Sequence, residues 1–193
     1  MDFKLLSELL FPEVTTTPEE LEERYPQRDL PEGAKVTRFA PSPTGFVHFG
    51  GLFPTTVGER LAHQSGGVFF LRIEDTDAKR EVEGAAEGLI KTLAKYGINF
   101  DEGAILDENG KICDKGAYGP YKQSRRAEIY QTYVKELIKQ GLAYPCFCSA
   151  EELDEIRAQQ ENEPQKGYWG KYAKCRNLTL AEIEEKINAG APW

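Results

Sequence analysis

Several features are scarce in this 193-residue sequence, and their scarcity excludes whole classes of protein. No stretch approaches the roughly 20 apolar residues that a membrane-spanning helix needs, so we do not expect the chain to be a membrane protein. The apolar run within residues 1–14 has acidic neighbours and no small-residue cleavage site, unlike a secretory signal. Only four cysteines are present, and without such a signal they favour reduced thiols. We therefore expect a cytoplasmic protein and exclude a secreted disulfide scaffold.

Positive charge is also in short supply, with 24 Lys and Arg against 32 Asp and Glu and a net charge of −8. Three basic and nine acidic residues fall within residues 1–34, so the rest of the chain is nearly balanced. Two basic runs, at 122–126 and 166–176, can therefore still form a local basic face suited to nucleic acid. Taken alone, such a run is more often only a solvated surface.

Residues 35–97 alternate between expected strands and expected helices. Strand patterns occur at 35–40 and at 68–74, and the second is nearly all apolar, as in a strand buried on both faces. Each is followed by a loop and a helix, and the two helices close at Gly66 and Gly97. This repeated order predicts the start of a parallel, doubly wound sheet.

The remainder of the chain predicts helices and loops. Residues 1–34 indicate an acidic helical extension, with one helix begun by Pro18, and nothing in it predicts catalysis. Residues 101–119 are polar and rich in glycine, so we expect a long loop there. Further helices are expected at 129–141, at 149–160 and from Thr179 onward.

The loop between the first strand and the first helix has the chemistry of a nucleotide site. Its Pro41–Gly45 turn exposes backbone, and ligands of open parallel sheets bind beyond the carboxyl ends of strands. Free N–H groups at a helix N-terminus favour phosphate, and Gly50 and Gly51 allow close approach to the backbone. His48 can donate a hydrogen bond to a phosphoryl oxygen. A histidine beside glycines is, by itself, more often a capping or packing residue.

Five motifs follow one another in the order found in bacterial glutamyl-tRNA synthetases, and over residues 35–193 the chain resembles that family. They are RFAPSPTG (38–45), HFGG (48–51), LRIEDTD (71–77) with Arg80, GPYKQS (119–124) and CFCSAEEL (146–153). HFGG resembles the class I signature His-Ile-Gly-His, with a fourth-position glycine that is common in the glutamyl branch. Phe53 and Pro54 depart from the Arg-Thr usual in the family.

The resemblance implies an α/β fold with three parts. Residues 35–120 would be the first half of a class I synthetase Rossmann-like parallel sheet domain. Residues 121–193 would be an inserted α+β acceptor-stem-binding subdomain, and residues 1–34 lie outside the resemblance. The implied function is ATP-dependent ligation of L-glutamate to tRNA(Glu) through a glutamyl-adenylate, by a monomeric enzyme with no membrane contact.

The resemblance also implies roles for individual residues. The residues that would bind glutamate are Arg38, Ala40, Ser42 and Glu74. The residues that would bind ATP are Thr44, His48, Gly50 and Gly51, and ATP would act with Mg²⁺. His48, Gly50 and Gly51 would also be the catalytic residues. Those that would contact tRNA phosphates are Gln123, Ser124 and Arg125.

Some members of the family hold zinc through a Cys-x-Cys pair and further ligands in the inserted subdomain. Cys146, Cys148 and Cys175 match three of those positions, and either Tyr168 or Tyr172 would be the fourth ligand. No histidine follows His63, which excludes a Cys₃His site in this segment. The alternative is three reduced thiols without metal.

One class I signature is missing from the sequence. Lys-Met-Ser-Lys-Ser does not occur, and the single methionine is Met1. We therefore expect an N-terminal fragment of a longer synthetase, inactive alone. Three alternatives remain: a glutamyl-queuosine-tRNA synthetase, a glutaminyl-tRNA synthetase, and a non-catalytic tRNA-binding module that retains the fold.

Overall fold

The computed structural model describes residues 1–45, 49–77 and 79–193. Two compact units are present: residues 19–130 form one, and residues 1–18 with 131–193 form the other. These units do not coincide with the predicted boundaries at residues 34 and 120. No helix in the described ranges combines the length and apolar character needed to cross a membrane.

The unit of residues 19–130 is built on a four-stranded sheet. Its strands are β1 (Val36–Phe39), β2 (Val68–Leu71), β3 (Glu102–Leu106) and β4 (Ile112–Lys115), in that order across the sheet. β1, β2 and β3 run parallel, and β4 is antiparallel to β3. This sheet confirms the predicted α/β class and both predicted strands.

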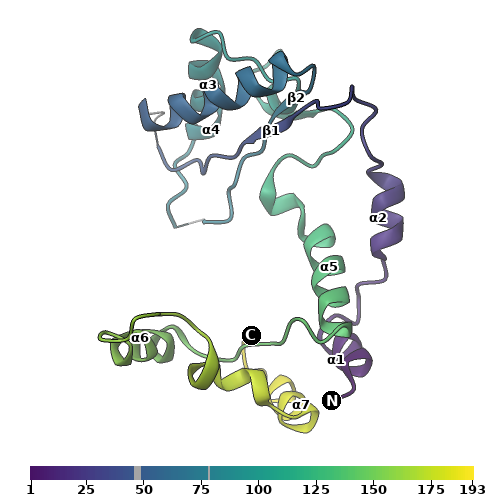
Figure 1. The fold of residues 1–193 in the computed structure, drawn as a ribbon, viewed down its shortest axis with the longest axis vertical. Coiled ribbons are helices and arrows are strands. Elements are labelled where there is room, and N and C mark those ends of the chain that lie inside the picture. The colour runs from purple at the N-terminus through teal and green to yellow at the C-terminus, as the bar shows by residue number, and fades with distance from the viewer. Residues whose placement is uncertain (46–48, 78) are drawn as a thin grey trace. The chain divides into compact units, whose positions relative to one another are not determined.

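Two helices pack on this sheet, as Figure 1 shows. Helix α3 (Phe49–Gln64) contacts β1 and β2, and α4 (Ala85–Lys95) contacts β3. The core between them includes Phe69 and Leu71 of β2 and Leu93 of α4, all fully buried. A short helix, α2 (Pro18–Arg24), starts at a proline and has acidic residues in its first turn, as predicted.

The prediction of a loop at 101–119 was wrong, because β3 and β4 form a hairpin there. The glycines and polar residues that suggested a loop have specific places in the hairpin. Gly103 lies where a Cβ would be 2.3 Å from the Leu71 carbonyl oxygen, so glycine permits β3 to pair with β2. At the turn, an Asp107 carboxylate oxygen accepts the backbone N–H groups of Asn109 and Lys111.

The second unit consists of helices and 3₁₀ turns. Helix α5 (Ala127–Lys139) starts in the first unit, and its residues from 131 onward belong to the second. Helices α6 (Ala150–Gln159) and α7 (Leu180–Asn188) follow. Capping boxes at Ser149 and Thr179 start α6 and α7 where the sequence predicts. Helix α1 (Phe3–Leu10) buries Leu6 and Leu10 in one cluster with Ile138 and Ile183. Residues 127–193, all of them described, contain no strand, although an α+β subdomain was expected.

Candidate functional site

The chain just beyond β2 runs between two other segments at the carboxyl ends of the parallel strands. On one side, the N–H groups of Arg72 and Glu74 donate to the carbonyls of Phe39 and Pro41 at 3.0 and 2.9 Å. On the other side, Ile73 donates to the Tyr121 carbonyl at 2.9 Å and accepts from the Gln123 N–H at 2.8 Å. Three segments are therefore held together at the edge where ligands of such sheets bind.

Glu74 lies at the centre of this arrangement, between two arginines. Its Oε1 is 2.7 Å from Nη2 of Arg72 and 3.5 Å from Nη1 of Arg38. The Arg38 side chain is 41% exposed and that of Arg72 only 17%. Two guanidinium groups around one carboxylate leave a net positive charge. Arg38 is more exposed than Arg72 and lies farther from Glu74, so Arg38 is the better placed of the two to bind a further carboxylate.

Arg72 lies within the LRIEDTD motif, but no role was predicted for it from the sequence. Its side chain can reach that of Glu74 because residues two apart on an extended chain share a face. That spacing, an arginine two positions before a glutamate at a strand end, was the available signal.

The other predicted glutamate and ATP residues lie on the loop after β1 and at the start of α3. Ala40 is half-buried, and Ser42 and Thr44 are exposed. Gly50 and Gly51 are in the first turn of α3, where the Thr55 hydroxyl donates to the Gly51 carbonyl at 2.6 Å. His48 lies outside the described residues, so the predicted phosphate contacts stay predictions.

The predicted tRNA-binding segment at 123–125 makes contacts within the fold. The Asp75 carboxylate accepts the Ser124 N–H at 2.9 Å and its hydroxyl at 2.6 Å, and Lys122 Nζ is 3.2 Å away. Burial alone would raise the pKa of Asp75, but the bonds from Ser124 and Lys122 outweigh it and lower the pKa below its usual value. The Gln123 side chain accepts from Thr76, and Arg125 is exposed. Ser124 thus anchors the segment to Asp75.

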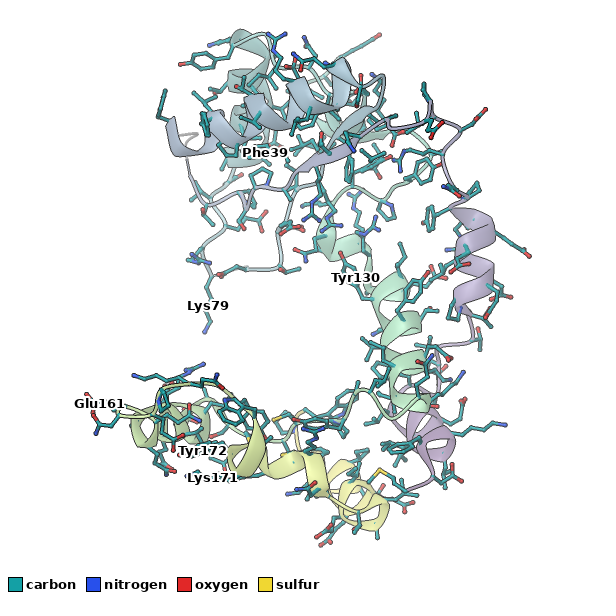
Figure 2. The ribbon with its side chains drawn as sticks, viewed as in Figure 1. Phe39, Lys79, Tyr130, Glu161, Lys171 and Tyr172 are labelled. Atoms are coloured by element: carbon teal, nitrogen blue, oxygen red, sulfur yellow. The ribbon has the colours of Figure 1, made fainter. Side chains whose placement is uncertain are left out.

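A loop follows β2 and extends beyond this anchor. Figure 2 shows Lys79 at its tip, with its side chain pointing away from the sheet. Arg80, from the same motif, pairs with Asp77 at 2.6 Å.

The three predicted zinc ligands lie together in the second unit. The sulfur atoms of Cys146, Cys148 and Cys175 lie within 4.8 Å of one another, and those of Cys148 and Cys175 are 3.8 Å apart. The Tyr168 hydroxyl is 3.4 Å from the Cys146 sulfur and 3.2 Å from that of Cys148. Tyr172 instead donates its hydroxyl to Glu163 at 2.6 Å. The structure thus places Tyr168, and not Tyr172, beside the thiols.

The 3.8 Å between the sulfur atoms of Cys148 and Cys175 is the spacing of two sulfur ligands in a tetrahedral zinc site. Zinc–sulfur bonds of about 2.3 Å at tetrahedral angles separate sulfur atoms by roughly 3.8 Å. Burial, then hydrogen bonding with Cys146 and Cys148, raises the pKa of Tyr168. Burial opposes ionisation of Cys146, but its hydrogen bond with Tyr168 and those within the cluster lower its pKa. Three thiols and one hydroxyl are a donor set that fits zinc.

Gln160 positions Tyr168 and was also missed by sequence reasoning. Its fully buried side-chain amide donates to the Gly167 carbonyl and accepts from the Gly167 N–H, both at 2.8 Å. These two bonds close the loop between α6 and Tyr168. Figure 2 labels three side chains near this loop, those of Glu161, Lys171 and Tyr172.

Charged side chains gathered at the carboxyl ends of three parallel strands are typical of the ligand-binding site of an α/β protein. Residues 35–193 match the family model described as tRNA synthetases class I (E and Q), catalytic domain. The chain belongs to this family, which confirms the predicted resemblance.

Individual relatives agree with this assignment. The chain is 55% identical to a glutamate–tRNA ligase of Clostridium perfringens, over 100% of this chain and 35% of the relative. It is 56% identical to one of Acetivibrio thermocellus, over 97% of this chain and 34% of the relative. A crystal structure of a glutamate tRNA ligase from Elizabethkingia meningosepticum, in complex with its amino acid, matches with a TM-score of 0.66 and 34% identity. That match covers 83% of this chain and 31% of the other. The chain thus spans about a third of the length of these relatives.

Proposed function

We propose that the chain forms part of an enzyme that activates L-glutamate with ATP and transfers it to tRNA(Glu). The observation that carries the proposal is the Arg38–Glu74–Arg72 cluster at the carboxyl edge of the parallel strands, in a chain of this family. An exposed guanidinium close to a carboxylate is suited to an amino acid that carries both an ammonium group and an extra carboxylate.

In this proposal each side chain has a distinct task. Arg38 binds the side-chain carboxylate of glutamate, Glu74 binds its ammonium group, and Ala40 and Ser42 line the pocket. Arg72 holds Glu74 in place through the 2.7 Å contact. The γ-carboxylate is thereby fixed, and the α-carboxylate is left free to react.

The reaction then proceeds in two transfers. An α-carboxylate oxygen of glutamate attacks the α-phosphorus of ATP, and pyrophosphate leaves. A hydroxyl of the terminal tRNA ribose next attacks the glutamyl carbonyl, and AMP leaves. Thr44, His48, Gly50 and Gly51 bind the nucleotide in this scheme, and Mg²⁺, when bound, offsets phosphate charge. The chain's contribution is positioning and charge stabilisation.

The test is an Arg38→Ala variant in the enzyme at the full length of its relatives. Loss of one partner of a charge pair is expected to cost about 2–5 kcal/mol in glutamate binding, with little change for ATP. ATP–pyrophosphate exchange, measured with tRNA present, gives both KM values. Arg60→Ala removes an arginine on α3 that is 70% exposed and serves as the matched control. Loss of ATP binding with glutamate binding intact would remove Arg38 from the amino-acid pocket.

We further propose that Cys146, Cys148, Cys175 and Tyr168 hold zinc. The support is the sulfur spacing together with the hydroxyl of Tyr168 3.2 Å from one thiol. A structural zinc would contribute folding energy to the segment that joins α5 to α7.

Of the three residues predicted to contact tRNA, we propose a direct contact for only one. Arg125, which is exposed, contacts a tRNA phosphate in this proposal, and Gln123 and Ser124 hold its segment in place. The monomeric state rests on the family resemblance and the cytoplasmic location on the four cysteines without a secretory signal; both stay predictions.

A further inference from the structure

The segment before the matched family region is linked to the candidate glutamate site by a network of partly buried side chains. The family model matches residues 35–193, and Arg28 precedes it. Nη2 of Arg28 is 2.6 Å from Oε2 of Glu102, and the two side chains are 20% and 17% exposed. The Arg28 guanidinium also lies 3.6 Å from the ring centroid of Tyr118. A planar cation between a carboxylate and an aromatic face is held in one orientation.

Tyr121 shares the same carboxylate oxygen. Its hydroxyl donates to Oε2 of Glu102 at 2.8 Å and accepts the Tyr118 N–H at 3.1 Å. Tyr121 is almost fully buried, and burial, reinforced by the bond to Glu102, raises its pKa to about 12. A Cβ at Gly116 would lie 2.8 Å from Glu102 and 2.9 Å from the Tyr121 hydroxyl, so the surroundings leave little room for rearrangement.

The backbone of Tyr121 continues this network to the site. Its carbonyl accepts the Ile73 N–H, and Ile73 in turn accepts the Gln123 N–H. Ile73 directly precedes Glu74, and Ser124 anchors the following Asp75. The order of contacts therefore runs from Arg28 through Glu102 and Tyr121 to the strand end that carries Glu74.

We propose that Arg28 is a positioning residue for glutamate, acting through Glu102 and Tyr121 on the segment that holds Glu74. Without Arg28, the partly buried Glu102 carboxylate loses a charged donor, which favours its displacement from this position. Tyr121 then loses its fixed acceptor, and the pairing of residues 121–123 with Ile73 loosens. The N-terminal extension thus takes part in substrate binding, a role its sequence did not predict. The inference rests on the proposed function for the identity of the substrate.

The experiment compares Arg28→Ala with Arg24→Ala in the full-length enzyme. Arg24 is the matched control, because it belongs to the same extension and pairs with Glu128 at 3.1 Å outside the network. Two readouts are needed: hydrogen exchange of the peptides covering 72–75 and 121–124, and the KM values for glutamate and ATP in pyrophosphate exchange with tRNA present. Melting temperature is recorded for each variant.

Arg28→Ala is expected to speed exchange in both peptides and to raise the KM for glutamate about tenfold, as for a residue that acts through intermediate contacts. The KM for ATP and every value for Arg24→Ala should stay close to wild type. If Arg28→Ala does not fold, Arg28→Lys keeps the charge but not the planar contact with Tyr118, and a smaller change in the same direction is expected.

Two results would overturn the inference. Unchanged exchange at 72–75 and 121–124 would show that the network does not hold the segment. Faster exchange with an unchanged KM for glutamate would reduce Arg28 to a stabilising contact. Absence of any glutamate-dependent activity in the wild type would instead refute the proposed function, and the exchange data would still decide whether the network exists.

Discussion

At the scale of single residues, Asp75 shows how a buried charge can fix a functional segment. Its side chain is only 4% exposed and is paired with Lys122 while accepting two hydrogen bonds from Ser124. The lowered pKa of Asp75 means that this anchor stabilises the fold most while the carboxylate is ionised. Asp75 directly follows Glu74, so the anchor also restrains the backbone beside Glu74.

The lowered pKa of Asp75 makes its contribution to stability depend on pH. A carboxyl group whose pKa is lower in the folded state stabilises the protein above its unfolded value, here 3.8, and loses that effect as pH falls through the folded value. Asp75→Asn is expected to lower the free energy of unfolding by about 1–3 kcal/mol near neutral pH, and by less at a pH well below 3.8. Denaturant titrations at both pH values measure the difference.

Asp77→Asn is the control, because Asp77 forms an exposed pair with Arg80 that is expected to contribute about 0–1 kcal/mol. A loss for Asp75→Asn that is the same at both pH values would contradict the assigned ionisation.

Residue roles could be predicted unevenly from the sequence. Arg38 and Glu74 were expected in one site, and they lie 3.5 Å apart. The choice between Tyr168 and Tyr172 was out of reach, because it depends on the loop that Gln160 closes through Gly167. Long-range pairs such as Arg28 with Glu102 leave no periodic trace in a sequence.

At the scale of elements, close backbone contacts depend on individual glycines. Gly67 joins α3 to β2, and a Cβ there would lie 1.9 Å from the Lys35 carbonyl oxygen. Gly67→Ala should therefore lower the free energy of unfolding by about 3 kcal/mol or more, because the two backbones must separate. Gly88→Ala is the control, since nothing lies within 4 Å of its Cβ position. In helix α4 that change should stabilise by up to about 1 kcal/mol. Equal effects of the two changes in denaturant titrations would contradict the packing at Gly67.

Metal binding by the cysteine cluster between α5 and α7 can also be tested. The purified protein should hold about one zinc per chain, and a chelator should loosen residues 140–180 while the sheet stays folded. Tyr168→Phe should weaken zinc binding at least about tenfold, whereas Tyr172→Phe, which removes only the bond to Glu163, should not. Metal analysis that finds no zinc, together with three freely titrating thiols, would contradict the site.

Helices were easier to predict than strands in this chain. Ser149 and Thr179 each begin a helix with a capping box, a signal contained in four consecutive residues. The β3–β4 hairpin was missed because residues 101–119 are polar and rich in glycine, and because the pairing of β3 depends on contact with β2.

At the scale of the whole molecule, the two compact units meet at residues 18–19 and 130–131, and not at the predicted boundaries of residues 34 and 120. Helix α1 was expected to belong to one acidic extension with residues up to 34. Instead its apolar face packs with Ile138 and Ile183, and Lys135 Nζ binds Glu8 and the carbonyls of Phe11 and Val14. An amphipathic pattern predicts that a helix buries one face but not which partner covers it. The functional identity of the predicted domains stays a prediction.

The measurement that tests the central claim most directly is ATP–pyrophosphate exchange by the full-length enzyme, with tRNA present, for glutamate, glutamine and aspartate in turn. Arg38 recognises a carboxylate in this account, so glutamine, which lacks that charge, should be a poor substrate. We predict exchange with glutamate and a kcat/KM at least about 100-fold lower for glutamine, because the Arg38 guanidinium is then left without a carboxylate partner. Exchange that is equal for glutamate and glutamine, or absent with glutamate, would contradict the account.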